Sequence, residues 1–309
     1  MGVTITGWGT ALPEKVITNA DLEARLDTSD QWITERSGIR ERRIGDSCAE
    51  LAIAAGRAAL MRAGMGPSDI DLLALATTTP DQSVPATSAH VAFELGLNCG
   101  AFDLNAACSG FVYSMVAASG MVGGHIRRVL LIGAERLSRI TDWEDRGTAV
   151  LFGDGAGAVV LEWVDGAGDL LAWDLGADGS LRPILYADLH GYITMNGKEV
   201  FRRAVRAMVE SAQATLERAG VSASEVSLLV PHQANIRIIE AATQRLGIPM
   251  ERTAVVLHRT GNTSSASIPL ALADAADAGR LSPGDLVLMC GFGAGMTWAS
   301  ALVRWSAAA

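Results

Sequence analysis

One stretch of the chain returns in altered form 156 residues later, and this internal repeat limits the possible folds more than any other feature. Met61–Leu73 matches Glu217–Leu229, with an Arg, an Ala, a Gly, a Ser and two Leu residues identical. Val129–Gly133 then matches Val287–Gly291 at nearly the same offset. Ordered matches of this kind favour duplication of one structural unit. The sequence therefore predicts a protein built from two copies of the same βαβ unit.

Apolar strand-like runs alternate with helix-like runs in both copies, which is typical of a layered α/β fold. We expect an α/β protein of two pseudo-twofold-related halves, residues 1–165 and 166–309, with one helix beginning at Phe201. The offset of 156 residues places Cys108 on Ser264 in the second half. Corresponding loops of two such halves should meet around the pseudo-twofold axis. We therefore expect the loops at Cys108, His232 and Asn262 to face one another.

The charge and cysteine content narrow the class of protein. A net charge of −9 argues against nucleic acid as a partner. The four cysteines have neither the spacing of a metal site nor that of a disulfide framework, so we expect reduced thiols and no metal. The sequence shows no signal peptide and no apolar run long enough to span a bilayer. We expect a cytoplasmic protein that has no membrane or nucleic-acid partner.

Cys108 lies where a strand-like segment passes into a helix-like run that is apolar on every face. Such a run belongs in the interior of a protein. A thiol at a helix start meets unpaired backbone N–H groups and the positive end of the helix dipole, which favour the thiolate. Cys108 is therefore a candidate nucleophile, although a buried cysteine is more often a small core residue.

His232 and Asn262 are candidate partners for this thiol. His232 precedes a helix expected to run to Leu246, and a helix start disfavours the imidazolium form. A neutral imidazole and the NH₂ group of Asn262 can each donate a hydrogen bond without carrying charge. A cysteine protease could show similar residues, and each residue alone fits an ordinary cap or turn. Two neutral donors without a carboxylate are better suited to stabilising the enolate formed when a thioester loses CO₂.

Several motifs together resemble the β-ketoacyl-[acyl carrier protein] synthase III family. They are Asp-Leu-Asn-Ala-Ala-Cys-Ser-Gly-Phe at 103–111, Val-Pro-His-Gln-Ala-Asn at 230–235, Gly-Asn-Thr-Ser-Ser-Ala-Ser-Ile-Pro at 261–269 and Gly-Phe-Gly-Ala-Gly at 291–295. The resemblance covers nearly the whole chain. It implies a thiolase-like αβαβα fold, a homodimer, and decarboxylative condensation of an acyl-CoA primer with malonyl-[acyl carrier protein]. These two thioesters are substrates, and no cofactor is implied.

The resemblance also implies roles for individual residues. Cys108 would carry the acyl group, His232 and Asn262 would promote decarboxylation, and the amides of Cys108 and Ala294 would form the oxyanion hole. The resemblance further implies residues that bind CoA (Trp32, Arg36, Arg146, Arg237), residues that bind the carrier protein (Gln233, Ala234, Asn235, Ile236, Arg237) and residues that line the acyl pocket (Val84, Phe152, Phe292).

A run of arginines after Phe201 supports an acidic protein partner independently. Arg202 and Arg206 would lie in the first turns of the helix expected to begin at Phe201, where positive charge opposes the helix dipole. On a chain with a net charge of −9, such a basic patch suggests selection for an anionic surface, and Arg245 would extend it. Acyl carrier proteins of this family are acidic. The alternative is a solvated helix face.

Two departures from the family pattern bear on the primer. The segment Gly179–Lys198 is shorter than the family pattern, and it should lie near the acyl pocket. Val84 occupies a loop position that reaches the partner subunit's acyl pocket and is often Phe, so longer or branched primers could enter. Alternatives are a related acyltransferase of secondary metabolism with a non-malonyl acceptor, and a thiolase. A thiolase would need a second catalytic Cys where Phe292 stands.

Overall fold

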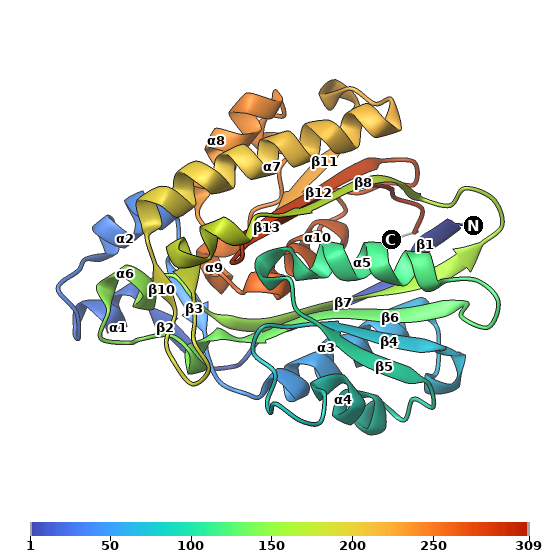
Figure 1. Ribbon diagram of the computed structural model, residues 1–309, viewed down its shortest axis with the longest axis horizontal. Coiled ribbons are helices and arrows are strands. Elements are labelled where there is room, and N and C mark those ends of the chain that lie inside the picture. The colour runs from blue at the N-terminus through green and yellow to red at the C-terminus, as the bar shows by residue number, and fades with distance from the viewer. Residues whose placement is uncertain (1, 308–309) are drawn as a thin grey trace.

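A computed structural model describes residues 2–307 as layers in the order helices, sheet, helices, sheet, helices (Figure 1). The α/β fold class predicted from the repeat and the resemblance is confirmed. In the described part of the chain, no helix is both long and apolar enough to cross a membrane.

The first sheet is five-stranded in the order β1-β7-β6-β4-β5, and all its strands come from residues 2–164. The β4 strand pairs in parallel with β5 and β6, so the polypeptide leaves all three strands at the same edge of the sheet. The Cys108 loop follows β5 directly. The strands are β1 (Gly2–Ala11), β4 (Leu72–Ala76), β5 (Gly100–Leu104), β6 (Arg128–Arg136) and β7 (Asp154–Val164).

The second sheet, in the order β11-β12-β13-β8, repeats the first with one strand missing. The β11, β12, β13 and β8 strands take the places of β4, β6, β7 and β1. The counterpart of β5 is reduced to a single parallel bridge between Leu229 and Thr253. The strands are β8 (Leu170–Ala177), β11 (Leu228–Pro231), β12 (Leu286–Gly293) and β13 (Thr297–Arg304).

The central helix layer contains α5 and α10, which lie between the two sheets (Figure 1). Both helices are apolar nearly all round, which suits a position covered on two sides. The outer helices α3 and α4 cover the first sheet, and α7 and α8 cover the second. The bounds are α3 (Cys48–Ala63), α4 (Thr87–Leu95), α5 (Gly110–Met121), α7 (Gly197–Ala219), α8 (Ile236–Leu246) and α10 (Ser267–Asp277).

Shorter elements gather beyond the edge where β4, β5 and β6 end (Figure 1). The Ser29 hydroxyl caps α2 by accepting from the Trp32 amide. A buried Arg42 in β3 joins β2 to the end of α6 within this region by donating to the carbonyl groups of Ile17 and Val150. The elements are β2 (Val16–Thr18), α1 (Asn19–Glu23), α2 (Asp30–Ser37), β3 (Glu41–Arg43), α6 (Arg146–Ala149), β9 (Leu185–Tyr186), β10 (Thr194–Met195) and α9 (Leu257–Thr260).

The two halves correspond at η2 (Ala107–Ser109) and η7 (Ser264–Ala266), the 3₁₀ turns that precede α5 and α10. A Cβ built on Gly291 would lie 3.2 Å from the carbonyl oxygen of Cys108, and one on Gly133 would lie 2.5 Å from that of Ser265. These matching approaches make Ser265 the counterpart of Cys108. The prediction of Ser264 is wrong by one residue, because the offset between the halves grows along the chain.

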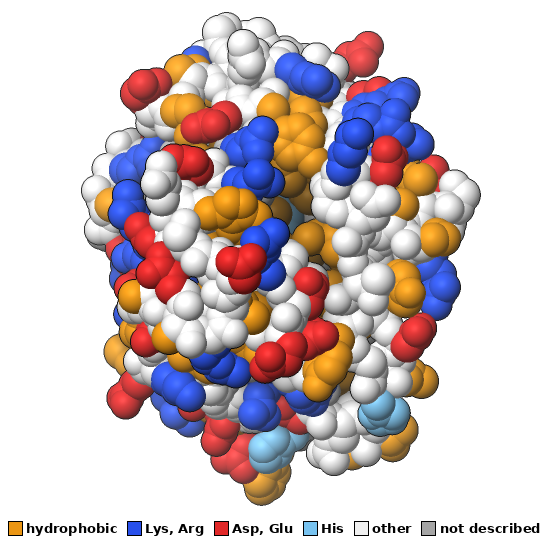
Figure 2. Space-filling view, turned by 90° about the vertical axis from the view of Figure 1, so that its left-hand side faces the viewer, with side chains coloured by type: hydrophobic (Ala, Val, Ile, Leu, Met, Phe, Trp, Pro, Cys, Tyr) orange, Lys and Arg blue, Asp and Glu red, His pale blue; other side chains and the backbone are white. Residues whose placement is uncertain are grey.

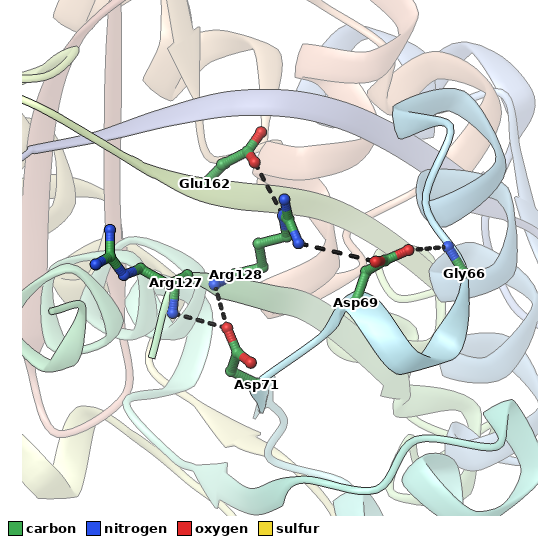
Figure 3. A network of polar contacts seen from close by, with 6 residues as sticks. All are labelled: Gly66, Asp69, Asp71, Arg127, Arg128 and Glu162. Carbon is green, nitrogen blue, oxygen red and sulfur yellow. Dashed lines mark hydrogen bonds and ion pairs between the residues drawn. The ribbon is translucent and has the colours of Figure 1, made fainter. Parts of the chain in front are cut away.

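Polar contacts hold the ends of the strands opposite this edge (Figure 3). The Asp71 carboxylate accepts hydrogen bonds from the backbone N–H groups of Arg127 (2.7 Å) and Arg128 (2.9 Å). The Arg128 side chain pairs with Glu162 on β7 at 2.9 Å. The start of β6 is thus fixed independently of its other end, which carries Glu135.

Candidate active site

A cavity of about 1000 Å³ opens at the edge where the strands of both halves end. Figure 2 shows a hollow on this face, with hydrophobic side chains inside it and Lys and Arg side chains around it. Cys108, His232 and Asn262 all line the cavity, together with Phe292 and Ala294. Residues that are far apart in the sequence therefore meet in one space, as the duplication predicted.

Cys108 lies in η2 directly after Ala107, whose φ of 49° is unusual for a residue with a side chain. The β12 strand approaches this turn very closely, since a Cβ built on Gly293 would lie 2.5 Å from the Cys108 amide nitrogen. Burial raises the pKa of Cys108 to about 12, opposed by a hydrogen bond from the Ser264 hydroxyl. The sequence predicted that the helix start favours the thiolate. In the structure, desolvation outweighs the helix end and favours the neutral thiol.

His232 is 1% exposed and contacts two side chains. Its Nδ1 lies 2.6 Å from the Ser267 hydroxyl, and its ring meets that of Phe292 edge-on, with centroids 5.5 Å apart. Because Ser267 occupies Nδ1, the other ring nitrogen is left for the cavity that His232 lines. Burial lowers the pKa of His232 to about 3, so the imidazole is neutral at physiological pH, as the sequence predicted.

Asn262 is 7% exposed and is fixed by both its backbone and its side chain. Its backbone N–H donates to the Leu151 carbonyl at 2.8 Å, and its carbonyl accepts from Gly153 at 3.0 Å. Its side-chain oxygen accepts from the Ser264 amide at 2.9 Å. The NH₂ group is therefore the part of the Asn262 amide that remains to serve a ligand in the cavity.

Sequence reasoning missed the roles of two serines. Ser264 contacts the Cys108 thiol, and Ser267 contacts the imidazole of His232. Both belong to the motif at 261–269, in which the sequence predicts a role only for Asn262. A serine motif gives no sign of which hydroxyl will face which group until the two halves are brought together.

Trp32 lies against two arginines, one of which, Arg36, lines the cavity. The guanidinium carbons of Arg36 and Arg146 each lie 4.8 Å from the centre of the Trp32 ring. Arg146 also donates to the Asp27 carbonyl at 2.7 Å. The stack formed by Trp32 and Arg146 is thus closed, and an adenine ring entering between them would have to move the arginine side chain.

The segment predicted to contact a carrier protein divides into exposed and buried residues. Ala234, Asn235 and Arg237 line the cavity, and Asn235 caps α8 by accepting from the Arg237 amide at 2.9 Å. Ile236 is half-buried beside Gly38. The prediction for Gln233 is wrong, because its side chain is fully buried. It bonds to backbone groups of Pro231, Ala254, Val256 and Leu257.

The arginine run lies further along its helix than predicted. The α7 helix begins at Gly197, with Asn196 as its cap and Glu199 in the first turn, so Arg202 is not in the first turn. Arg202 pairs with Glu199, and Arg206 pairs with Glu210, each at 2.7 Å. Both arginines and Arg245 are exposed. Glu199 therefore faces the positive end of the helix dipole, and the prediction that Arg202 opposes this dipole from the first turn is wrong.

Of the three residues assigned to the acyl pocket, two line the cavity and one does not. Phe152 and Phe292 line the cavity, and the segment Gly179–Lys198 contributes η4 (Gly179–Ile184), β9 and β10 to its wall. Val84 is 83% exposed and does not line the cavity of its own chain. Among residues 2–307, no cluster of three or more His, Cys, Asp or Glu side chains is arranged to hold a metal ion.

Comparison with known proteins agrees with this geometry. Residues 102–179 match the family model described as 3-Oxoacyl-[acyl-carrier-protein (ACP)] synthase III, and residues 216–305 match the model of its C-terminal part. The chain is 50% identical to beta-ketoacyl-[acyl-carrier-protein] synthase III of Roseiflexus castenholzii, over 98% of each chain. It is 49% identical to the protein of that name from Geobacillus kaustophilus, over 99% of each.

Solved structures give the same result. The 3-oxoacyl-[acyl-carrier-protein] synthase III of Aquifex aeolicus superimposes with a TM-score of 0.96 at 48% identity, covering 98% of this chain and 100% of that one. The Pseudomonas aeruginosa enzyme also gives a TM-score of 0.96, at 43% identity and 99% coverage of each chain. With its central cysteine, histidine and asparagine in one cavity, this chain belongs to the β-ketoacyl-[acyl carrier protein] synthase III family of condensing acyltransferases.

Proposed function

We propose that this chain condenses an acyl-CoA primer with malonyl-[acyl carrier protein], giving a 3-oxoacyl-[acyl carrier protein] and CO₂ and so initiating fatty acid synthesis. The observation that carries this proposal is the meeting of Cys108, His232 and Asn262 in one cavity of about 1000 Å³. A nucleophile beside two neutral donors suits a reaction that first forms a thioester and then an enolate.

In the first step the Cys108 sulfur attacks the carbonyl carbon of the acyl-CoA thioester. A new S–C bond forms, the bond to CoA sulfur breaks, and the thiol proton leaves with the CoA thiol. Because burial raises the pKa of Cys108 to about 12, loss of this proton accompanies attack on the primer. The amides of Cys108 and Ala294 stabilise the negative oxygen of the tetrahedral intermediate.

In the second step malonyl-[acyl carrier protein] loses CO₂ and leaves an enolate. The Gln233 amide nitrogen lies 3.4 Å from the Ser267 oxygen, which leaves the Ser267 hydrogen to be donated to Nδ1 of His232. This arrangement keeps the His232 proton on Nε2, directed at the enolate oxygen. The Asn262 NH₂ group is the second donor. No positive charge is needed, which agrees with the lowered pKa of His232.

In the third step the enolate carbon attacks the acyl group on Cys108. The new C–C bond forms, the C–S bond breaks, and the cysteine sulfur leaves and regains a proton. The same oxyanion hole serves this step, since charge again develops on the carbonyl oxygen. Hydrophobic side chains such as Phe152 and Phe292 hold the acyl chain.

The proposal extends to the partners and to the assembly. Arg36, Arg146 and Trp32 hold the nucleotide of CoA, and Arg237, Arg202, Arg206 and Arg245 face an acidic carrier protein. The chain forms a homodimer along β5, an edge strand of the first sheet. Val84 and Phe93, which are 83% and 76% exposed, support this interface, with Val84 reaching the partner's acyl pocket.

Two further assignments belong to this proposal. The protein acts in the cytoplasm, a compartment in which thiols such as its four cysteines stay reduced. Residues 1–165 and 166–309 are the duplicated halves, with strands of the first sheet ending at Val164 and strands of the second beginning at Leu170.

Intact-protein mass spectrometry after incubation with a panel of acyl-CoA thioesters tests the proposal. We expect one acyl group per chain, mapping to Cys108, and no adduct on Cys108→Ala. The chain lengths and branches that give an adduct then define the primer. An unmodified protein across the panel, or an adduct elsewhere, contradicts the proposal.

A further inference from the structure

A fully buried carboxylate lies next to the active site and has no role in the three steps above. Glu135 is the second-to-last residue of β6 and is 0% exposed. One of its oxygens lies 2.6 Å from the Thr79 hydroxyl and 2.9 Å from the Thr78 hydroxyl. The other lies 2.8 Å from the Ser265 hydroxyl. All of these partners are neutral, so Glu135 accepts from hydroxyl and amide donors without an opposing charge.

These contacts join the two halves of the molecule. Thr78 and Thr79 follow β4 in the first half, whereas Ser265 lies in η7 of the second half. The single hydrogen of the Ser265 hydroxyl is shared between Glu135 and the carbonyl oxygen of Ala76, which lies 2.9 Å away, and the Ser265 amide also donates to Glu135 at 3.4 Å. Glu135 therefore fixes η7 to the end of the first sheet.

The contact between Glu135 and Ser265 occupies the same place in one half of the molecule as Cys108 and Gly293 occupy in the other. Ser265 corresponds to Cys108, and Gly293 occupies in β12 the place that Glu135 occupies in β6. In the second half, the absence of a side chain at Gly293 lets β12 approach the Cys108 amide. One copy of the duplicated junction thus holds the nucleophile, and the other holds a carboxylate–serine contact.

Ser264 connects this contact to the catalytic donors. Its φ of 47° lies in the left-handed region, which a residue with a side chain keeps only where the surroundings enforce it. Asn262 is fixed on one side of Ser264 by Leu151 and Gly153, and Ser265 is fixed on the other by Glu135. The Ser264 amide in turn holds the side-chain oxygen of Asn262 at 2.9 Å, so the direction of the Asn262 NH₂ depends on this strained residue.

We propose that Glu135 is a positioning residue for decarboxylation, holding Ser265 so that the strained Ser264 keeps the Asn262 amide directed at the enolate. The inference rests on the proposed function, because it assigns Asn262 to the second step. It predicts that damage to the Glu135–Ser265 contact separates the two half-reactions. Acylation depends on the sulfur and the oxyanion amides, whereas decarboxylation depends on the Asn262 side chain.

The test compares E135Q, S265A and the double variant E135Q/S265A. Acylation is followed by mass spectrometry, and decarboxylation by CO₂ release from malonyl-[acyl carrier protein]. A misplaced catalytic group costs on the order of 10²-fold in rate, so we expect E135Q to lower decarboxylation about 10- to 100-fold. Acylation should not fall by more than about threefold, since E135Q leaves the sulfur and the oxyanion amides in place and removes a charge that raises the pKa of Cys108. S265A removes one hydroxyl and leaves the threonine donors of Glu135 in place. The same two rates can therefore be measured on S265A if E135Q folds poorly.

The double variant and a matched control separate positioning from general destabilisation. If Glu135 acts through Ser265, the double variant is no slower in decarboxylation than E135Q. D71N removes a carboxylate that accepts backbone N–H groups at the opposite end of β6, and it should lower the melting temperature without changing the ratio of the half-reactions (Figure 3). Parallel loss of both half-reactions in E135Q and S265A, or multiplied losses in the double variant, overturns the inference. Failure of the wild-type protein to acylate Cys108 would instead overturn the proposed function.

Discussion

Nδ1 of His232 lies 2.6 Å from the hydroxyl oxygen of Ser267, and this contact determines which ring nitrogen faces the cavity. Both groups are buried, and both belong to the second half of the chain. A small serine hydroxyl thus does for this imidazole what a carboxylate does in a catalytic triad, but without stabilising the charged form. In the proposed mechanism the histidine is therefore a hydrogen-bond donor and not a base.

The first prediction concerns this hydroxyl. Ser267→Ala leaves Nδ1 of His232 without its partner and allows the proton to move to that nitrogen. We expect decarboxylation of malonyl-[acyl carrier protein] to fall about 10-fold or more, since one oxyanion donor is worth roughly 10²–10³ in rate. Acylation of Cys108 should be nearly unchanged. Ser119→Ala, which removes a hydroxyl bonded to Met115 within α5, is the control and should leave both rates intact. Equal losses in both half-reactions would argue against the assignment.

The second prediction follows from the lowered pKa of His232, about 3. In the unfolded chain a histidine has an ordinary pKa of about 6.5, so below that pH the unfolded state binds a proton that the folded state refuses. The free energy of unfolding is therefore unaffected by protonation of this histidine well above pH 6.5, and it decreases as the pH falls below that value. At pH 5 this amounts to about 2 kcal/mol.

Urea unfolding of the wild type and of His232→Asn between pH 5 and 8 measures this effect. The difference in unfolding free energy between them should shrink by about 2 kcal/mol from pH 7 to pH 5. A difference independent of pH would mean that the folded histidine titrates normally.

The third prediction follows from the raised pKa of Cys108, about 12. Only the thiolate reacts with iodoacetamide, so the alkylation rate follows the thiolate fraction. With the pKa raised by burial, the rate at Cys108 should increase about tenfold per pH unit from pH 7 to pH 10 without reaching a plateau. Peptide mapping assigns the modified residue, and Cys108→Ser shows the background from the other cysteines. A plateau below pH 8 would instead indicate a thiolate in the free enzyme.

The fourth prediction concerns the close approach of β12 to the nucleophile. A methyl group at Gly293 would lie 2.5 Å from the Cys108 amide nitrogen, so Gly293→Ala must displace η2. We expect acylation to fall on the order of 10²-fold, because both the sulfur and its amide move. We also expect about 1–3 kcal/mol of lost stability. Gly120→Ala is the matched control, since a Cβ there meets no atom within 4 Å. Normal acylation in the Gly293 variant would show that η2 tolerates displacement.

Much of the fold could be predicted because the repeat and the apolar runs carry it. The run after Cys108 has no polar face, so α5 had to lie between two covering layers. The capping serine Ser29 marks the start of α2 by a local hydrogen bond, which sequence reasoning can find. His232 and Asn262 could be placed beside Cys108 because duplication brings corresponding loops to one axis.

The rest depends on contacts between segments far apart in the chain. Glu135 stands in the sequence as an ordinary charged residue at a strand end, and only the packing of η7 against β6 shows it as a buried acceptor. Gln233 belongs to the family motif, yet its side chain satisfies backbone groups near Ala254 and Val256 and faces the interior. The state of the Cys108 thiol was misjudged because a helix start is visible in a sequence, whereas desolvation is not.

The assignment of His232 to decarboxylation is tested most directly by measuring the two half-reactions in His232→Ala. Acylation of Cys108 by acyl-CoA is followed by mass spectrometry, and loss of CO₂ from malonyl-[acyl carrier protein] is followed in the same preparation. We predict that acylation stays close to the wild-type rate while decarboxylation falls by about 10²-fold or more. An equal loss of both half-reactions would show that His232 acts on the cysteine, and the division of roles described here would be wrong.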